Sequence, residues 1–167
     1  RLGAMLRSML DIEAARDILF AGASGDAWYG SSTADVLSGL DATSASRHVE
    51  GYAHSVWELL LHSTGWMEEV ARRLEGRAPS PPPDGDWPAP GETTDAAWEE
   101  AQHRFRAAAV NLGERMAGFD PARWATKVGE SREQALGTGV TYAAMVVGVI
   151  QHNAYHTGQM ALVRKAL

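Results

Sequence analysis

The chain has no cysteine among its 167 residues. This absence excludes disulfide bonds, cysteine-ligated zinc or iron–sulfur sites and cysteine nucleophiles. It also fits the reducing environment of the cytoplasm, where we expect the protein to be located. A chain of this length can bury one hydrophobic core, so we expect a single domain over residues 1–167.

Positive charge and long apolar runs are also scarce. Fifteen Lys and Arg residues stand against 21 Asp and Glu residues, which gives a formal net charge of −6. Binding to a phosphate backbone needs clustered positive charge, so we expect no nucleic-acid partner. No run approaches the ~18 consecutive apolar residues of a spanning helix, and charges interrupt the N-terminal segment. We therefore expect neither a secretory signal there nor a membrane partner.

Apolar residues recur with helical spacing in four long segments, whereas no segment alternates as a β-strand would. We predict helices over about residues 2–21, 55–74, 94–116 and 140–167, and a short helical segment over 33–40. Gly22 and Gly76 are the expected ends of the first two long helices. Ser55 and Glu58 have the spacing of a capping box at the start of the second.

A long connection, residues 77–92, joins the second and third predicted helices and holds most of the chain's seven prolines. Sixteen extended residues reach about 50 Å, whereas a helix of 22 residues is about 33 Å long. The connection can therefore cross the whole length of a bundle, and the two helices can run parallel. The predicted fold class is all-α, a four-helix bundle with a Pro-rich crossover between helices 2 and 3.

Residues 134–163 contain no Asp, Glu, Lys or Arg. A helix without a charged face has little to present to water, so we expect the fourth helix to be the most buried element of the bundle. Its middle nevertheless carries two histidines and several amides. Each polar group that is buried without a partner costs about 1–3 kcal/mol, so these side chains need partners.

The two histidines, His152 and His156, are four residues apart and therefore lie on one helical face. This is the spacing by which a helix offers two imidazoles to one metal ion. Asn153 occupies the position of the glutamate in His-Glu-x-x-His metalloproteases, so their general base is absent. His62, on the apolar face of the second helix beside Trp66, is the best candidate for a third ligand. Histidines that are only hydrogen-bonded in the core are the alternative.

The other histidines are weaker candidates. We expect His103 to be solvated, because it lies off the apolar stripe of its helix. Glu100 and His103 resemble half of a di-iron carboxylate motif, but that site needs a second copy, which the sequence lacks. We place His48 and His54 at the surface or at the end of the bundle.

Two segments resemble the DinB/YfiT-like superfamily. They are Trp-Glu-Leu-Leu-Leu-His at 57–62 and Gln-His-Asn-Ala-Tyr-His-Thr-Gly-Gln-Met-Ala-Leu-Val at 151–163. The resemblance implies a four-helix bundle of up-down-down-up connectivity and a divalent metal held by three histidines, which correspond here to His62, His152 and His156. It also implies a homodimer, and it links several branches of the superfamily to low-molecular-weight thiols, as in bacillithiol S-transferases.

Three neutral imidazoles leave a zinc-like ion with an open position. A water bound there has a pKa of roughly 7, and a bound thiol is deprotonated. Because the chain has no cysteine, a thiolate must come from a small-molecule cosubstrate. We therefore favour a metal-dependent transferase that activates a low-molecular-weight thiol. A hydrolase that activates water and a non-catalytic metal-binding or ligand-binding bundle are the alternatives.

All-imidazole sites accept several metals, and we expect zinc, with nickel as an alternative that purification could also introduce. Four further residues are candidates for contacts with the ligands or the substrate: Glu58, Trp66, Tyr155 and Gln159. For Glu58, the capping box is the simpler interpretation. The sequence identifies no general base.

Overall fold

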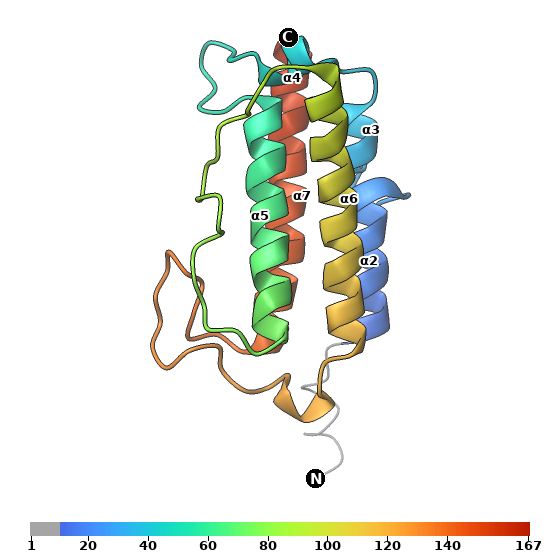
Figure 1. The fold of residues 1–167 in the computed structure, drawn as a ribbon. Coiled ribbons are helices and arrows are strands. Elements are labelled where there is room, and N and C mark those ends of the chain that lie inside the picture. The colour runs from blue at the N-terminus through green and yellow to red at the C-terminus, as the bar shows by residue number, and fades with distance from the viewer. Residues whose placement is uncertain (1–10) are drawn as a thin grey trace.

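A computed structural model describes residues 11–167, and this part of the chain is all-helical (Figure 1). The elements are α2 (Ile12–Ser24), α3 (Thr33–Leu37), α4 (Ala42–Ser46), α5 (Val56–Leu74), α6 (Asp95–Ala117), the 3-10 helix η1 (Pro121–Arg123) and α7 (Tyr142–Ala166). The four long helices, α2, α5, α6 and α7, lie side by side as a bundle, which confirms the predicted fold class. None of the described helices is both long and apolar enough to cross a membrane.

The first predicted helix differs from the structure. Its first residues, 2–10, lie outside the described part of the chain, and α2 continues past Gly22 to Ser24. The prediction that Gly22 ends the helix is therefore wrong. A Cβ atom at Gly22 would lie 2.6 Å from the Tyr29 hydroxyl. Glycine at this position therefore lets the Tyr29 side chain pack directly against the backbone of α2. The short segment predicted over 33–40 ends at Leu37, and α4 was not predicted.

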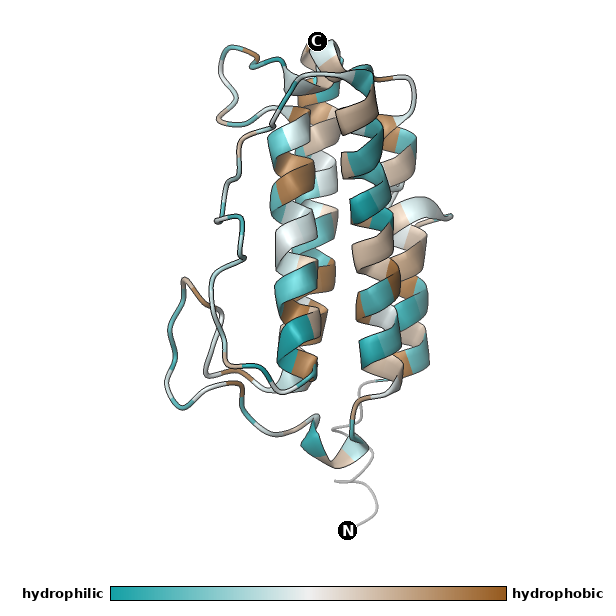
Figure 2. Cartoon of the chain, in the orientation of Figure 1, coloured by the Kyte–Doolittle hydropathy of each residue, from teal (hydrophilic) through white to brown (hydrophobic). Residues whose placement is uncertain are grey.

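The later helices begin and end close to the predicted residues. Ser55 and Glu58 form the capping box of α5, and Gly76 follows its end with a φ of +90°. Thr94 caps α6, and Thr141 caps α7. Hydrophilic residues recur along the visible face of α6, as on a helix with one solvated side (Figure 2).

Helices α5 and α6 run parallel. Three side-chain contacts follow the same order along both: Trp57–Trp98, Glu68–Arg104 and Glu75–Arg115. The crossover returns along α5 to make this possible (Figure 1). It approaches closely at Gly65, where an added Cβ would lie 3.1 Å from Pro82. Helix α7 runs antiparallel to α5, because His152 lies beside His62 whereas Leu136, before α7, contacts Arg73.

The most buried long helix is α5, not α7. Fourteen of the 19 residues of α5 are buried, against nine of the 25 residues of α7. Helix α5 packs against α6, α7 and the crossover, whereas one side of α7 faces solvent and exposes Tyr155 and Leu162. The prediction failed because the lack of charge in α7 does not mean that its whole circumference is packed.

A buried ion pair ties the crossover to α5. Arg73 Nε donates to Glu69 Oε1 at 2.8 Å, and both side chains are at least 98% buried. Arg73 also donates to the carbonyl oxygens of Ser80 at 3.2 Å and Leu136 at 2.7 Å. The Ser80 N–H donates to Glu69 Oε1 at 2.9 Å. The pair therefore joins α5 to the start of the crossover and to the loop before α7.

Replacing Arg73 should be strongly destabilising. In Arg73→Met the buried Glu69 carboxylate keeps only the partly exposed Arg72 as a cationic partner. We therefore expect the free energy of unfolding to fall by about 3 kcal/mol, the lower end of the range for a broken buried pair. Urea unfolding measures the change. The matched control is Arg104→Met, which removes more exposed pairs with Glu68 and Asp84 and should cost about 1 kcal/mol or less. Equal losses in the two variants would contradict this account.

Candidate metal centre

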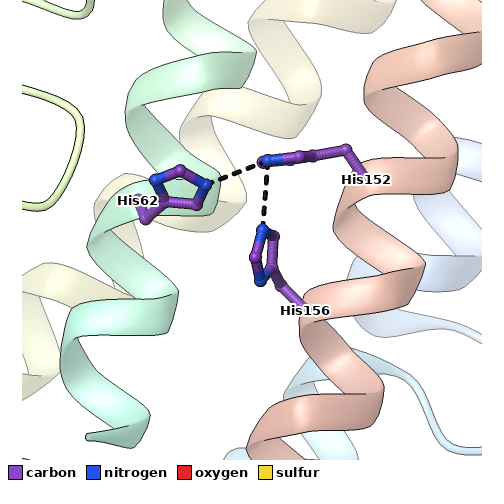
Figure 3. Close-up of side chains that lie close together, drawn as sticks. All are labelled: His62, His152 and His156. Atoms are coloured by element: carbon purple, nitrogen blue, oxygen red, sulfur yellow. Dashed lines mark hydrogen bonds between the residues drawn. The ribbon is translucent and has the colours of Figure 1, made fainter. Parts of the chain in front are cut away.

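The three predicted histidines converge between α5 and α7 (Figure 3). His62 comes from α5, and His152 and His156 lie one turn apart on α7. The Nε2 atom of His152 is 2.9 Å from that of His62 and 3.1 Å from that of His156. The structure therefore brings together the three side chains that the sequence singled out as candidate ligands.

Hydrogen bonds fix the protons of two rings. His62 Nδ1 lies 2.6 Å from the Asp86 carbonyl oxygen, which can only accept a hydrogen bond. His156 Nδ1 lies 2.5 Å from Gln159 Oε1, which is also an acceptor. Both Nδ1 atoms must therefore carry the proton, and in neutral rings both Nε2 atoms present lone pairs.

These two lone pairs face His152 Nε2, which can donate a proton to only one of them. A cation among the three atoms would satisfy all of them at once. Nitrogens bound at about 2.0–2.1 Å to one tetrahedral ion lie about 3.3 Å apart, a few tenths of an ångström more than the two contacts of His152. The residues present therefore fit a divalent metal.

Burial keeps the three imidazoles neutral. Desolvation is the main cause that lowers the pKa of each ring, and it lowers that of His152 and of His156 to about 4. The neighbouring imidazoles of His156 and His62 lower the pKa of His152 further. At pH 7 the rings are thus in the unprotonated form that binds metals.

The crossover supplies two contacts to His62 that the sequence analysis missed. Asp86 accepts the hydrogen bond of His62 through its carbonyl, and its Oδ1 accepts one from Trp66 Nε1 at 2.7 Å. The Trp87 ring stacks on His62, with ring centroids 3.8 Å apart and planes within 4°. The only sequence signal was an Asp-Trp pair inside a Pro-rich segment, because irregular backbone has no periodicity that places a side chain.

His54 has a larger part than the sequence suggested. Its ring stacks on the other face of Trp87, with centroids 3.6 Å apart, so Trp87 is held between two imidazoles. The expectation of a simple surface or end-of-bundle residue is therefore incomplete, although the side chain is still 31% exposed. His48 is exposed, as expected, and its Nε2 lies 3.3 Å from Glu58 Oε2.

The other candidate residues divide between the site and the scaffold. Gln159 accepts from His156 and donates to the Tyr155 hydroxyl at 3.2 Å, and Tyr155 is 64% exposed. Trp66 reaches the site through Asp86. Glu58 forms the capping box and does not belong to the histidine group. His103 is exposed, as predicted.

A groove of about 410 Å³ opens beside the histidines, between α5, α7 and the loop over residues 132–137. His62 and His152 line one part of it. Much of the remaining wall is apolar and includes Val70, Leu136, Met145 and Val149. Volumes of this size are typical of small-molecule sites, so a ligand in the groove would lie next to the histidine cluster.

Loss of the Asp86 carboxylate should weaken metal binding. In Asp86→Ala the carbonyl that holds His62 remains, but the anchor to Trp66 is lost, so we expect the zinc affinity to fall about tenfold. Competition with a chromophoric chelator measures it. Asp84→Ala is the matched control, because Asp84 lies in the same crossover and pairs with Arg104 instead. An unchanged affinity in Asp86→Ala, or an equal loss in the control, would refute this role.

Comparison with known proteins identifies the family of this chain. A family model described as the DinB superfamily matches residues 29–160, which include all three histidines. Searches of curated proteins and of solved structures gave no significant match. The family match covers most of the chain and confirms the resemblance seen in its motifs. The chain belongs to the DinB superfamily.

Proposed function

We propose that this protein is a metal-dependent enzyme that activates a low-molecular-weight thiol for transfer to an electrophilic substrate. One observation carries the proposal: three neutral imidazoles converge beside a groove large enough for a small molecule. Within residues 11–167, the ligand group contains no fourth His, Asp or Glu. Three protein ligands and a free position are typical of catalytic rather than structural zinc sites.

A divalent ion in this site supplies Lewis acidity that favours the thiolate form of a coordinated thiol. The chain's own residues keep the three imidazoles neutral and aimed at one point, and the groove holds the reactants beside them. With a haloalkane, the thiol sulfur forms a bond to carbon as the carbon–halogen bond breaks. The halide leaves, and the thiol proton passes to solvent.

Zinc is the metal that we propose, with nickel as the alternative. Imidazole nitrogens suit both ions, so the ligand set supports a divalent metal without selecting between them. The homodimer implied by the sequence resemblance stays a prediction, as does the identity of the thiol and of the electrophile.

Halide release tests the proposal. Zinc-loaded protein incubated with a haloalkane and one of several low-molecular-weight thiols, bacillithiol among them, should release halide. Release should require protein, metal and thiol together. His156→Ala should abolish this activity, because two imidazoles cannot hold the ion in the same geometry. His103→Ala, which changes an exposed histidine on α6, should keep it.

Two other results would contradict the thiol proposal. Turnover of esters without added thiol would favour the hydrolase. Stoichiometric zinc without turnover, over a panel of several thiols and electrophiles, would favour a non-catalytic metal-binding bundle.

A further inference from the structure

The groove beside the histidines is long, and the cluster lies at one end of it. On α5 its lining extends from His62 to Arg73, and the eleven residue steps between them span about 16 Å along the helix axis. On α7 it extends from His152 back to Ala144 and on to Val140 in the preceding loop. A molecule that fills the groove is therefore elongated, with one end at the histidines.

The middle of the groove is apolar. Trp66 and Val70 line it from α5, and Met145 and Val149 line it from α7. The small residues Ala144 and Gly148 add little bulk to the α7 wall. Such a lining favours a hydrocarbon chain or ring over a polar backbone.

Charge is distributed unevenly along the groove. Within the described part of the chain, one carboxylate lines it, that of Asp86 beside His62. At the far end, Arg73 is neutralised by Glu69 and also donates to backbone carbonyls. Arg132 also lines the groove and belongs to the loop whose Leu136 carbonyl contacts Arg73, so it lies toward the same far end. Among residues 11–167 Arg132 forms no ion pair with a carboxylate.

Backbone contacts hold the Arg132 guanidinium without using all of its donors. Its Nη1 donates to the carbonyl oxygens of Glu133 at 3.0 Å and Thr138 at 3.2 Å. Among residues 11–167, Nε and Nη2 have no hydrogen-bond partner, so both remain for a ligand. These neighbouring donors match the two oxygens of a carboxylate, which arginine binds in a bidentate manner.

We propose that the groove binds an elongated thiol with an apolar middle and a carboxylate at the end remote from the sulfur. The sulfur lies at the histidine cluster, and the carboxylate pairs with Arg132. This inference rests on the proposed function and adds the chemical class of the cosubstrate to it.

Mercaptoalkanoic acids test this inference on cobalt-loaded protein, where a sulfur-to-cobalt absorption band reports thiol binding. The series extends from mercaptopropionate to mercaptoundecanoate, and each acid is compared with the mercaptoalcohol of the same length. We expect a long acid to bind about fivefold more tightly than its alcohol, the gain of one exposed ion pair. Mercaptopropionate is too short to reach Arg132 and should show no such advantage.

Two variants distinguish pairing with Arg132 from a general effect of the protein's net charge. Arg132→Gln should lose the advantage of the long acid and keep the affinity for the long alcohol. Arg106→Gln makes the same change in net charge at an exposed position on α6 and should keep both. Circular dichroism and cobalt stoichiometry check that each variant is folded and loaded.

The outcomes distinguish this inference from the proposed function. If all thiols bind but long acids and alcohols bind equally, the pairing with Arg132 is refuted and thiol activation stands. The pairing with Arg132 is also refuted if Arg132→Gln still binds the long acid more tightly than the alcohol, or if Arg106→Gln loses this preference. If cobalt is bound but no thiol produces the band, the proposed function fails and this inference fails with it.

Discussion

The rest of the structure depends on one arrangement of three imidazoles. The Nε2 lone pairs of His62 and His156 both point at the Nε2 atom of His152. The Asp86 carbonyl and the Gln159 side chain each accept the Nδ1 proton of one ring, so neither His62 nor His156 has a proton to offer at Nε2. Without a cation, one of the two contacts to His152 joins two acceptors. Protonation of one ring would remove this conflict between two acceptors. Burial disfavours the charged form, however, and lowers the pKa of each ring. A metal ion shared by the three rings would resolve this arrangement.

The fold keeps the three rings in this position. Helix α5 carries one ligand candidate and α7 carries two, and both belong to the packed core of the bundle. The parallel course of α5 and α6 requires the long crossover. The crossover in turn places Asp86 and Trp87 in contact with His62. The buried pair of Glu69 and Arg73 fixes the start of that segment. The crossover is therefore more than a linker, because it supplies two of the contacts of His62.

The sequence allowed us to predict the features that depend on helical periodicity and on contacts between residues close in the chain. Helical spacing placed His152 and His156 on one face, and the apolar stripe of the second helix placed His62 toward them. The Ser55–Glu58 capping box marked the start of α5 correctly. Asp86 and Trp87 could not be placed, because their positions depend on how the crossover folds back over α5. The burial of α7 was overestimated because a lack of charge reports composition, whereas burial depends on which neighbours pack against each side.

The most direct test of the account is X-ray absorption spectroscopy at the zinc edge on zinc-loaded protein of known stoichiometry. We expect one zinc per chain, with three imidazole nitrogens at about 2.0–2.1 Å and the scattering pattern of intact imidazole rings. Fewer than three imidazoles around the ion, or much less than one zinc per chain, would show that His62, His152 and His156 do not form a metal centre.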